Sequence, residues 1–341
     1  MPTNVTPEYK RAEADFRSAR TPEDRLAGLR EMLRTVPKHK GTEHLQADIR
    51  SRIKELTDEL AGPRKGGAQT GPAHVVHPDG AGQVVLLGPP NSGKSALHDR
   101  LTGSHVAVGG YPFTTQFPQP GMLPHLDVGI QLVDLPAVAA AHPVPWLANA
   151  LQPADGTLLV VDLGDPGCVE AVEELHDQLA DRRVFLTGDW TAPGGGEVDP
   201  DDEDADPFAV HLPTLLVATK ADRVDHYDDE LAAFGELTGR DYPAVTVSAE
   251  TGAGLDAIGA FLFDRLGVVR VYTKLPGHAP DKARPFTVRR GQTVDDVAAL
   301  IHKDLSATLR WARLWRGEIE GLQVGRHHVV EDGDVLEIHT H

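Results

Sequence analysis

Cysteine and aromatic residues are scarce in this chain of 341 residues, which has one cysteine, Cys168, and 5% aromatic residues. A single cysteine excludes an internal disulfide and suits a reducing compartment. No apolar run approaches the ~20 residues needed to span a bilayer, and residues 1–16 lack the apolar segment of a secretory signal. The length is enough for two or three domains. We therefore expect a globular, cytoplasmic protein without a membrane partner.

Basic residues are also outnumbered, because 33 Lys and Arg face 51 Asp and Glu and give a net charge of −18. We therefore do not expect DNA binding. The excess of acid lies in the centre, since residues 1–65 hold 14 basic and 11 acidic groups and residues 268–341 hold 11 and 10. Either end could contact RNA through a local basic patch, or both could be solvated surfaces of mixed charge.

Residues 1–62 show the periodicity of helices. Thr21 can cap a helix that begins at Pro22, Pro37 ends it, and a shorter helix is expected from Tyr9 to Phe16. The basic turn 37–41 is either a phosphate-contacting tip or a solvated turn. Residues 63–80 are rich in Gly and Pro and are interpreted as a linker. The two longer helices would each bury one stripe, formed by Leu26, Leu29, Leu33 and Val36 and by Leu45, Ile49, Ile53, Leu56 and Leu60.

Residues 81–267 contain short apolar runs that alternate with helical or loop stretches. Such runs are typical of strands buried on both faces, so we predict an α/β domain with a mostly parallel sheet and helices on both faces. Residues 188–207 are acidic and rich in Gly and Pro, which indicates a mobile surface loop rather than a metal site. The predicted strands are 83–87, 130–133, 157–161, 214–218 and 244–247.

Residues 268–341 follow a different pattern, that of a small β-grasp-like α+β domain. A helix over 293–305 would bury one face, formed by Val294, Val297, Leu300, Ile301 and Leu305. The predicted strands are 268–274, 286–288, 312–315, 327–330 and 334–340.

Residues 88–95, GPPNSGKS, match the phosphate-loop pattern G-x-x-x-x-G-K-[ST] directly after a predicted strand. Glycines let backbone N–H groups curl around phosphates, and the following helix N-terminus adds partial positive charge. Lys94 is expected to reach the outer phosphates and the Ser95 hydroxyl to bind Mg²⁺. The other nucleotide contacts expected in and beside this loop are Gly88, Asn91, Ser92, Gly93 and Ala96.

Two further motifs, TKAD and SAE, each follow a predicted strand. A carboxylate at Asp222 can accept two hydrogen bonds from the N1–H and 2-amino groups of guanine, whereas adenine offers no such pair. Lys220 would pack its stem over the base, and Thr219 stands where Asn is usual. The motifs favour GTP over ATP, so an ATPase is a weaker reading. The loop expected at the guanine oxygen holds Ser248, Ala249 and Glu250.

Oxygen ligands for a metal ion are expected between these motifs. Asp134 ends the predicted strand 130–133. The loop 109–121, GGYPFTTQFPQPG, contains two adjacent threonines, one of which would complete a magnesium shell when a third phosphate is present. The alternative is a loop with ordinary threonines.

In this order, the motifs resemble the Obg-related translation-factor GTPases, and best the developmentally regulated GTP-binding (DRG) branch with its C-terminal TGS domain. The resemblance implies Thr115 as the switch residue on magnesium and Asp134 in the magnesium shell through water. It also implies that Ser248 and Ala249 flank the base. Terminal modules of relatives bind ribosomes or RNA. Asn91 matches the asparagine of potassium-stimulated relatives, so K⁺ is a candidate cofactor beside Mg²⁺.

The segment after Asp134 departs from related GTPases. Ala137 replaces the glycine that contacts the last phosphate, which would bias a switch by about 1–2 kcal/mol if its movement passes through φ > 0. Val138 stands where Ras-type enzymes have a water-orienting Gln, so hydrolysis is expected to be slow and its catalytic residue is not identified. The sequence favours a GTPase switch on ribosomes or RNA. The alternative is a GTP-binding scaffold with little hydrolysis whose terminal modules bind a protein.

Overall fold

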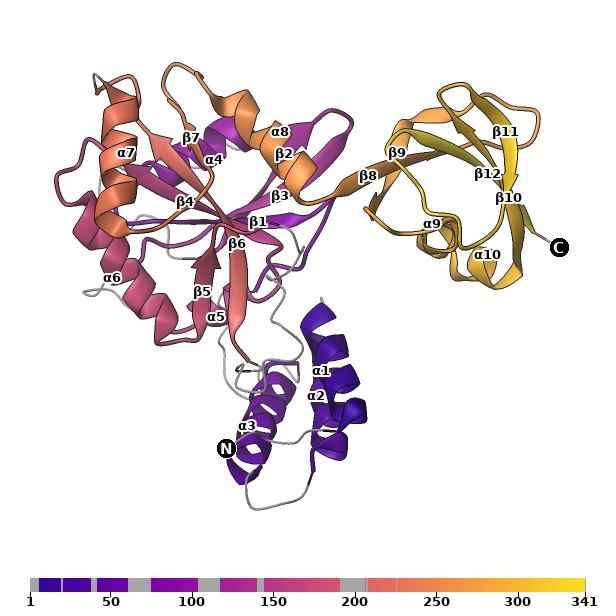
Figure 1. The fold of residues 1–341 in the computed structure, drawn as a ribbon, viewed down its shortest axis with the longest axis horizontal. Coiled ribbons are helices and arrows are strands. Elements are labelled where there is room, and N and C mark those ends of the chain that lie inside the picture. The colour runs from indigo at the N-terminus through magenta and orange to yellow at the C-terminus, as the bar shows by residue number, and fades with distance from the viewer. Residues whose placement is uncertain are drawn as a thin grey trace, which may run out of the picture.

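The computed structural model describes residues 6–19, 21–37, 42–60, 75–103, 117–139, 144–190, 206, 208–224 and 226–340. These residues form a helical body, a seven-stranded sheet with helices, and a separate five-stranded sheet with two helices (Figure 1). The strand β8 runs from the larger sheet body toward the smaller one (Figure 1). The predicted combination of an α/β domain with a β-grasp domain is confirmed.

The helical body contains α1 (Pro7–Ser18), α2 (Pro22–Thr35) and α3 (Glu43–Leu60). The predicted cap is present, because the Thr21 side chain accepts a hydrogen bond from the Asp24 N–H and Pro22 follows it. Thr6 caps α1 in the same way. The basic turn between α2 and α3 lies largely outside the described residues. The core of this body holds Tyr9, Ala12, Leu29, Met32, Val36 and Ile49.

The larger sheet has the order β2-β3-β1-β4-β6-β5, with β7 also paired to β6. All pairs are parallel except β2 with β3. All five predicted strands are present, but β2 and β5 were not predicted. Both are edge strands with exposed positions, so they lack a continuous apolar run. The strands are β1 (Gln83–Leu87), β2 (Gln119–His125), β3 (Val128–Asp134), β4 (Gly156–Asp162), β5 (Val184–Thr187), β6 (Val210–Thr219) and β7 (Ala244–Thr246).

Helices cover both faces of this sheet, as predicted. On one face, α4 (Lys94–Thr102) and α8 (Leu255–Arg265) bury apolar side chains in one core cluster. On the other face, α5 (Leu147–Leu151), α6 (Cys168–Ala180) and α7 (Tyr227–Thr238) contribute to a second cluster. The sheet residues of both clusters are almost fully buried, which explains the continuous apolar runs in the sequence.

The start of segment 188–207 is buried at Trp190, so the expectation of a surface loop is wrong there. The Trp190 side chain is 7% exposed, and its indole N–H donates to the Thr214 carbonyl at 3.1 Å. Just beyond the segment, Phe208 packs edge-on against Phe16 and under the Arg52 guanidinium at 4.2 Å. Residues 191–205 and 207 lie outside the described residues.

The end of the predicted linker 63–80 also joins the larger sheet. The Val76 carbonyl accepts a hydrogen bond from Gln83 Nε2 at 2.9 Å, and Gly80 forms a bridge with Ile130. Residues 61–74 lie outside the described residues.

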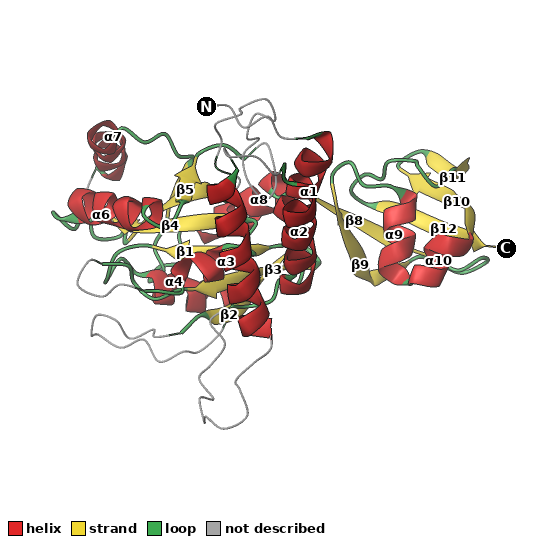
Figure 2. Cartoon of the chain, turned by 90° about the horizontal axis from the view of Figure 1, so that it is seen from below, coloured by secondary structure: helices red, strands yellow, loops and turns green. Residues whose placement is uncertain are grey.

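The smaller sheet has the order β11-β10-β12-β8-β9, in which only β12 and β8 are parallel. Its helices α9 and α10 lie on one face (Figure 2). The elements are β8 (Val268–Thr273), β9 (Asp281–Arg289), α9 (Val294–Ile301), α10 (Lys303–Thr308), β10 (Leu309–Arg316), β11 (Ile319–Val324) and β12 (Asp334–Thr340).

Three predictions for this body were wrong in detail. The helix expected over 293–305 is two helices, because His302 has an extended backbone with φ −164° and ψ 137°. Leu300 is 53% exposed and lies outside the buried face. Residues 327–330 form no strand. The His328 carbonyl instead accepts the Val294 N–H at the start of α9, and the Val330 N–H donates to the Gln292 carbonyl just before that helix. The edge strand β11, largely exposed, was not predicted.

The two sheets are joined by an ion pair at the amino-terminal edge of the larger sheet. Arg289 of β9 donates to Asp155 Oδ2 at 3.0 Å, and the same oxygen accepts the Gln83 N–H at 2.9 Å. The Asp155 side chain is 4% exposed and that of Arg289 17%. Nearby, Arg270 of β8 donates to Asp127 in the β2–β3 turn at 2.8 Å. The smaller body therefore attaches where the strands β1, β3 and β4 begin.

We expect Arg289→Met to lower the free energy of unfolding by about 2–5 kcal/mol, because it leaves the buried Asp155 carboxylate without its guanidinium. The matched control is Arg290→Gln. Its 74% exposed side chain lies 3.5 Å from Asp264, so the loss should stay below about 1 kcal/mol. Urea denaturation followed by circular dichroism measures both, and equal losses would contradict the role of Arg289.

Candidate nucleotide-binding site

The predicted motifs meet at one edge of the larger sheet because they all follow parallel strands. The strands β1, β3, β4, β6 and β7 run in the same direction, so their carboxyl ends share this edge. Ligands in open α/β sheets bind at this edge. The phosphate loop follows β1, Asp134 ends β3, and Thr219 ends β6.

The phosphate loop has the backbone that its glycines predict. Gly88 has φ 155°, and a side chain there would bring a Cβ within 2.3 Å of the Val160 carbonyl oxygen. Gly93 has φ 92° and directly precedes α4. Asn91 has φ 61°, in the left-handed region that Asn tolerates. The loop therefore turns tightly into the N-terminus of α4, where the first N–H groups lack helical acceptors.

Lys94 lies inside this loop, with 6% of its surface exposed. Its Nζ donates to the Gly88 carbonyl at 3.1 Å and to the Pro89 carbonyl at 3.0 Å. Burial lowers the pKa of Lys94 to about 8, against the opposing influence of the Asp134 charge. An anion beside the loop would compensate the buried ammonium better than neutral carbonyls do.

Ser95 and Asp134 form a pair of oxygen donors that fits Mg²⁺. The Ser95 hydroxyl donates to Asp134 Oδ2 at 2.6 Å, from the first turn of α4 to the end of β3. Mg²⁺ binds oxygen and takes few protein ligands beside water and phosphate. The described part of the chain contains no group of three or more His, Cys, Asp or Glu residues placed to hold a metal. Thr115 lies outside the described residues.

The segment after Asp134 packs into the sheet body. Val138 is 1% exposed and belongs to a core cluster, and its N–H donates to the Gly88 carbonyl at 3.4 Å. Ala137 is not among the described residues with positive φ, so alanine is not strained in this conformation. The valine side chain is apolar and packs in the core, so it offers no polar atom to orient water.

The TKAD motif is bonded to the phosphate loop. The Thr219 hydroxyl lies 2.6 Å from the Ser92 carbonyl and 3.1 Å from that of Val161, so it can donate to either. Lys220 Nζ donates to the Asn91 carbonyl at 2.9 Å and to Asp162 Oδ2 at 2.6 Å. Thr219 thus connects the two motifs.

Asp162 is a site residue that the sequence reading did not single out. It ends β4 and forms the ion pair with Lys220. The available signal was its place directly after an apolar strand, the same position that Asp134 has after β3.

Asp222 of TKAD meets the SAE motif. Its Oδ1 accepts a hydrogen bond from the Ser248 hydroxyl at 2.5 Å, and this bond holds the pKa of Asp222 below its usual value. The Ser248 hydroxyl in turn accepts the Thr251 N–H at 3.1 Å. Ser248 is buried, Ala249 half-buried and Glu250 exposed. The carboxylate is therefore oriented and held in its ionised form beside the SAE motif.

Comparison with known proteins agrees with this geometry. Residues 83–187 match the 50S ribosome-binding GTPase family, and residues 269–340 match the TGS domain family. The chain therefore combines a domain of this GTPase family with a TGS domain. The predicted resemblance to the DRG branch is confirmed, because developmentally regulated G-proteins are among its relatives.

Two relatives and one solved structure show how far the similarity of this TGS-domain GTPase extends. An uncharacterized GTP-binding protein of Halobacterium salinarum is 26% identical, with 93% of this chain and 98% of the relative covered. Developmentally-regulated G-protein 1 of Arabidopsis thaliana is also 26% identical, with 90% and 88% covered. The YchF GTPase of Schizosaccharomyces pombe shares the fold with a TM-score of 0.53, at 14% identity and with 77% and 98% covered.

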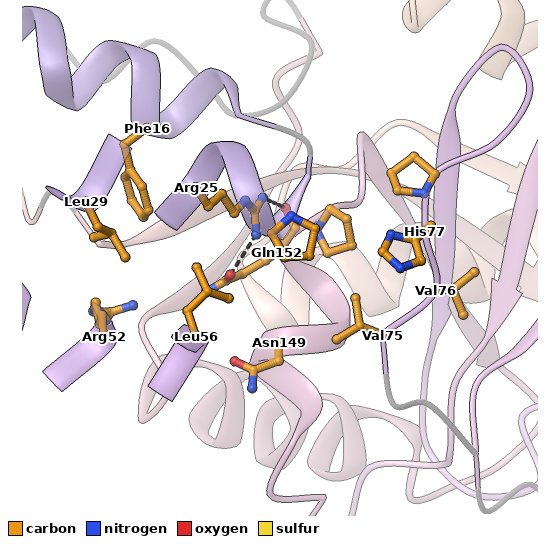
Figure 3. Close-up of a pocket in the computed structure, with 13 residues that line it drawn as sticks. Phe16, Arg25, Leu29, Arg52, Leu56, Val75, Val76, His77, Asn149 and Gln152 are labelled. Carbon is orange, nitrogen blue, oxygen red and sulfur yellow. Dashed lines mark hydrogen bonds between the residues drawn. The ribbon is translucent and has the colours of Figure 1, made fainter. Parts of the chain in front are cut away.

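A separate cavity of roughly 70 Å³ lies between the helical body and α5 of this TGS-domain GTPase (Figure 3). Arg25 of α2 lines it and donates to the side chain and carbonyl of Gln152 at 2.6 and 2.5 Å. Burial lowers the pKa of Arg25 to about 10. Gln152 follows α5 and precedes β4, so the cavity lies toward the amino-terminal edge of the sheet, away from the nucleotide motifs.

We expect nucleotide binding to take up a proton above about pH 8. The folded pKa of Lys94, about 8, is below its ordinary value of 10.5, so the free site is partly neutral there. Phosphates favour the charged form and raise that pKa. Calorimetry in buffers of different ionisation enthalpy measures the uptake, which should vanish below about pH 7. Lys94→Arg stays charged and should show none. Equal uptake in both proteins would refute the assignment.

Proposed function

We propose that this GTP-binding protein is a nucleotide switch with slow Mg²⁺-dependent GTP hydrolysis, which associates with ribosomes or RNA in the cytoplasm. The observation that carries the proposal is a pair of hydrogen bonds made by the TKAD motif: the Thr219 hydroxyl donates to the Ser92 carbonyl of the phosphate loop, and Asp222 accepts from the Ser248 hydroxyl of the SAE motif. A motif that contacts both the phosphate loop and the SAE motif suits a nucleotide that must be recognised at both ends.

Guanine recognition is assigned to Asp222, with Lys220 beside the base and Ser248, Ala249 and Glu250 in the adjoining loop. The ionised carboxylate matches two N–H donors of guanine. The Lys220 stem extends from β6 toward the phosphate loop, where Nζ meets the Asn91 carbonyl. The proposed phosphate contacts are Gly88, Asn91, Ser92, Gly93, Lys94, Ser95, Ala96 and the backbone of Ala137.

Magnesium is assigned to Ser95 directly, to Asp134 through water, and to Thr115 when a third phosphate is present. The ion would neutralise phosphate charge as the bond to the last phosphate breaks. This chain's own part is to orient the phosphates with Lys94 and the loop. K⁺ at Asn91 rests on the resemblance alone. Val138 leaves the attacking water without a side-chain partner there, which supports slow turnover.

The terminal bodies are the proposed partner-binding parts. The matching family is described as ribosome-binding, and a TGS domain lies at the opposite edge of the sheet from the nucleotide. No helix in the described part of the chain has the length and apolar character needed to cross a membrane. We propose four parts: a helical segment over residues 1–62, a linker over 63–80, a GTPase domain over 81–267 and a TGS domain over 268–341.

A GTP-binding scaffold with little hydrolysis is the second candidate. It is favoured by the Val138 contacts, because its side chain is in the core and its N–H donates to the Gly88 carbonyl. A segment held in this way has less freedom to respond to the last phosphate.

We expect Asp222→Asn to lower GTP affinity by about tenfold to a hundredfold, because one hydrogen bond to a charged group is worth about 1.5–3 kcal/mol. Xanthosine triphosphate carries oxygen in place of the 2-amino group, so the Asn amide can donate to it and its binding should improve. Glu236→Gln, at an exposed position of α7 outside the proposed site, is the control, and it should change neither affinity. Competition with a fluorescent nucleotide measures both. If the nucleotide preference does not change, Asp222 does not read the base.

We expect phosphate release from GTP to be slow for the free protein and faster with ribosomes, since the buried Val138 offers no polar side chain to orient the attacking water. Release is measured with and without ribosomes, in K⁺ and in Na⁺. Fast release by the free protein would contradict the slow switch, and none under any condition would favour the scaffold. Equal rates in K⁺ and Na⁺ would remove the potassium site at Asn91.

A further inference from the structure

The TGS sheet has one face turned away from its helices and core. Side chains alternate along a strand, so the core residues Ala312 and Leu314 place Trp311, Arg313 and Trp315 of β10 on the opposite face. The face continues across the neighbouring strand β12, where Trp311 pairs with His339, Arg313 with Glu337 and Trp315 with Val335. We call Lys274, Trp311, Arg313, Trp315, Glu337 and His339 the aromatic face.

The two tryptophans of the aromatic face do not belong to the hydrophobic core of the TGS domain. Within the described residues, the core cluster of this body contains neither Trp311 nor Trp315, and both are only half-buried. Figure 2 shows α9 and α10 against the same sheet, and Ala298 of α9 belongs to the same core cluster as Leu314 and Leu336 of the strands, on the other side of the sheet. Large half-exposed rings on an open sheet are unusual for stability alone, because they leave apolar surface in water.

A ring or a cation accompanies each tryptophan. The Trp311 and His339 rings are stacked, with centroids 3.7 Å apart and planes at 14°. Arg313 Cζ lies 5.7 Å from the Trp311 centroid, and Lys274 Nζ lies 4.1 Å from that of Trp315. On the other side of Trp315, β11 presents Gly321, where a Cβ would lie 3.5 Å from the ring. Because Gly321 has no side chain, no Cβ covers the Trp315 ring at this position.

The charge of the aromatic face is favourable for an anion, although the whole chain is acidic. Glu337 is the only carboxylate of the six residues, and it is 3% exposed. Burial alone would raise the pKa of Glu337, but the hydrogen bond with His339 and the charge of Lys274 hold it below its usual value. Lys274 and His339 lie 3.5 and 2.8 Å from its oxygens. The outward charge of the face is therefore that of the exposed Arg313.

Ring faces beside cations on a flat sheet are complementary to unpaired nucleotides. Every base has a π-face that stacks on an aromatic ring, and its phosphate is attracted by a neighbouring cation. A duplex offers no free base faces, so such a surface selects single strands. Protein interfaces are also enriched in Trp and Arg, so a protein partner is the alternative, and it predicts no binding of oligouridine.

We propose that the aromatic face binds single-stranded RNA, with bases stacked on Trp311 and Trp315 and a phosphate contacting Arg313. The proposal rests on the ribosome or RNA association proposed above and names the surface and the form of RNA. Since the TGS domain attaches at the edge of the larger sheet opposite the nucleotide, RNA and GTP can bind at the same time.

The test uses the full chain and measures the fluorescence anisotropy of a labelled oligouridine and of an RNA duplex of the same length. Trp311→Ala and Trp315→Ala should each weaken oligouridine binding roughly 5- to 150-fold, the loss that corresponds to one stacked base. The matched control is Phe185→Ala. This phenylalanine is 42% exposed and stacks on His211, but it lies in the GTPase domain, so its loss should leave RNA binding unchanged.

Two measurements separate stacking from charge and do not depend on the alanine variants folding. Arg313→Gln should reduce the slope of log affinity against log salt by about 0.7, the value for one phosphate contact on a single strand. Trp311→Phe keeps a ring and should retain most of the affinity at an unchanged slope. Thermal unfolding and GTP affinity confirm that each variant is folded.

Binding of the duplex as tightly as the single strand, or undiminished binding by both alanine variants, would overturn the proposal. Ribosome co-sedimentation distinguishes this from failure of the proposed function. If the wild-type chain sediments with ribosomes and both alanine variants do so equally, the ribosome association is supported and the role of the aromatic face in RNA binding is refuted. If the wild-type chain binds neither ribosomes nor oligouridine, both proposals fail.

Discussion

The parallel pairing of β1, β3, β4, β6 and β7 is the constraint on which the site depends. It brings the ends of five strands to one edge, so segments distant in the chain meet there. The phosphate loop, Asp134, Asp162 and the TKAD motif need only follow their strands to become neighbours. Hydrogen bonds such as Thr219 to Ser92 then hold the TKAD motif and the phosphate loop at a defined separation.

The same sheet separates the proposed nucleotide site from the TGS domain. Nucleotide motifs occupy the carboxyl edge, whereas the Arg289–Asp155 ion pair fixes the TGS domain at the amino edge. The strand β3 spans both, because it ends at Asp134 and begins after the turn that holds Asp127, which bonds Arg270. A displacement of β3 at the proposed nucleotide site would therefore reach the TGS domain through one strand, the turn that precedes it and an ion pair.

The sequence predicted those parts whose physics is local. The glycines of the phosphate loop are required by backbone angles and close contacts within a few residues, as Gly88 shows. Core strands are recognised because both their faces are buried. The edge strands β2, β5 and β11 could not be found in this way, since exposed positions interrupt their apolar pattern. His302 divided a helix that periodicity alone would continue.

By itself, then, the sequence determined the fold class, the phosphate loop and the positions of the strand-end motifs, because short segments carry their own conformational preferences. Tertiary structure decided which distant side chains meet. It paired Lys220 with Asp162, buried Trp190 in the sheet body, and aligned Trp311 with His339 on one face. These contacts depend on strand order and register, which arise only when the whole chain packs, and no local pattern encodes them.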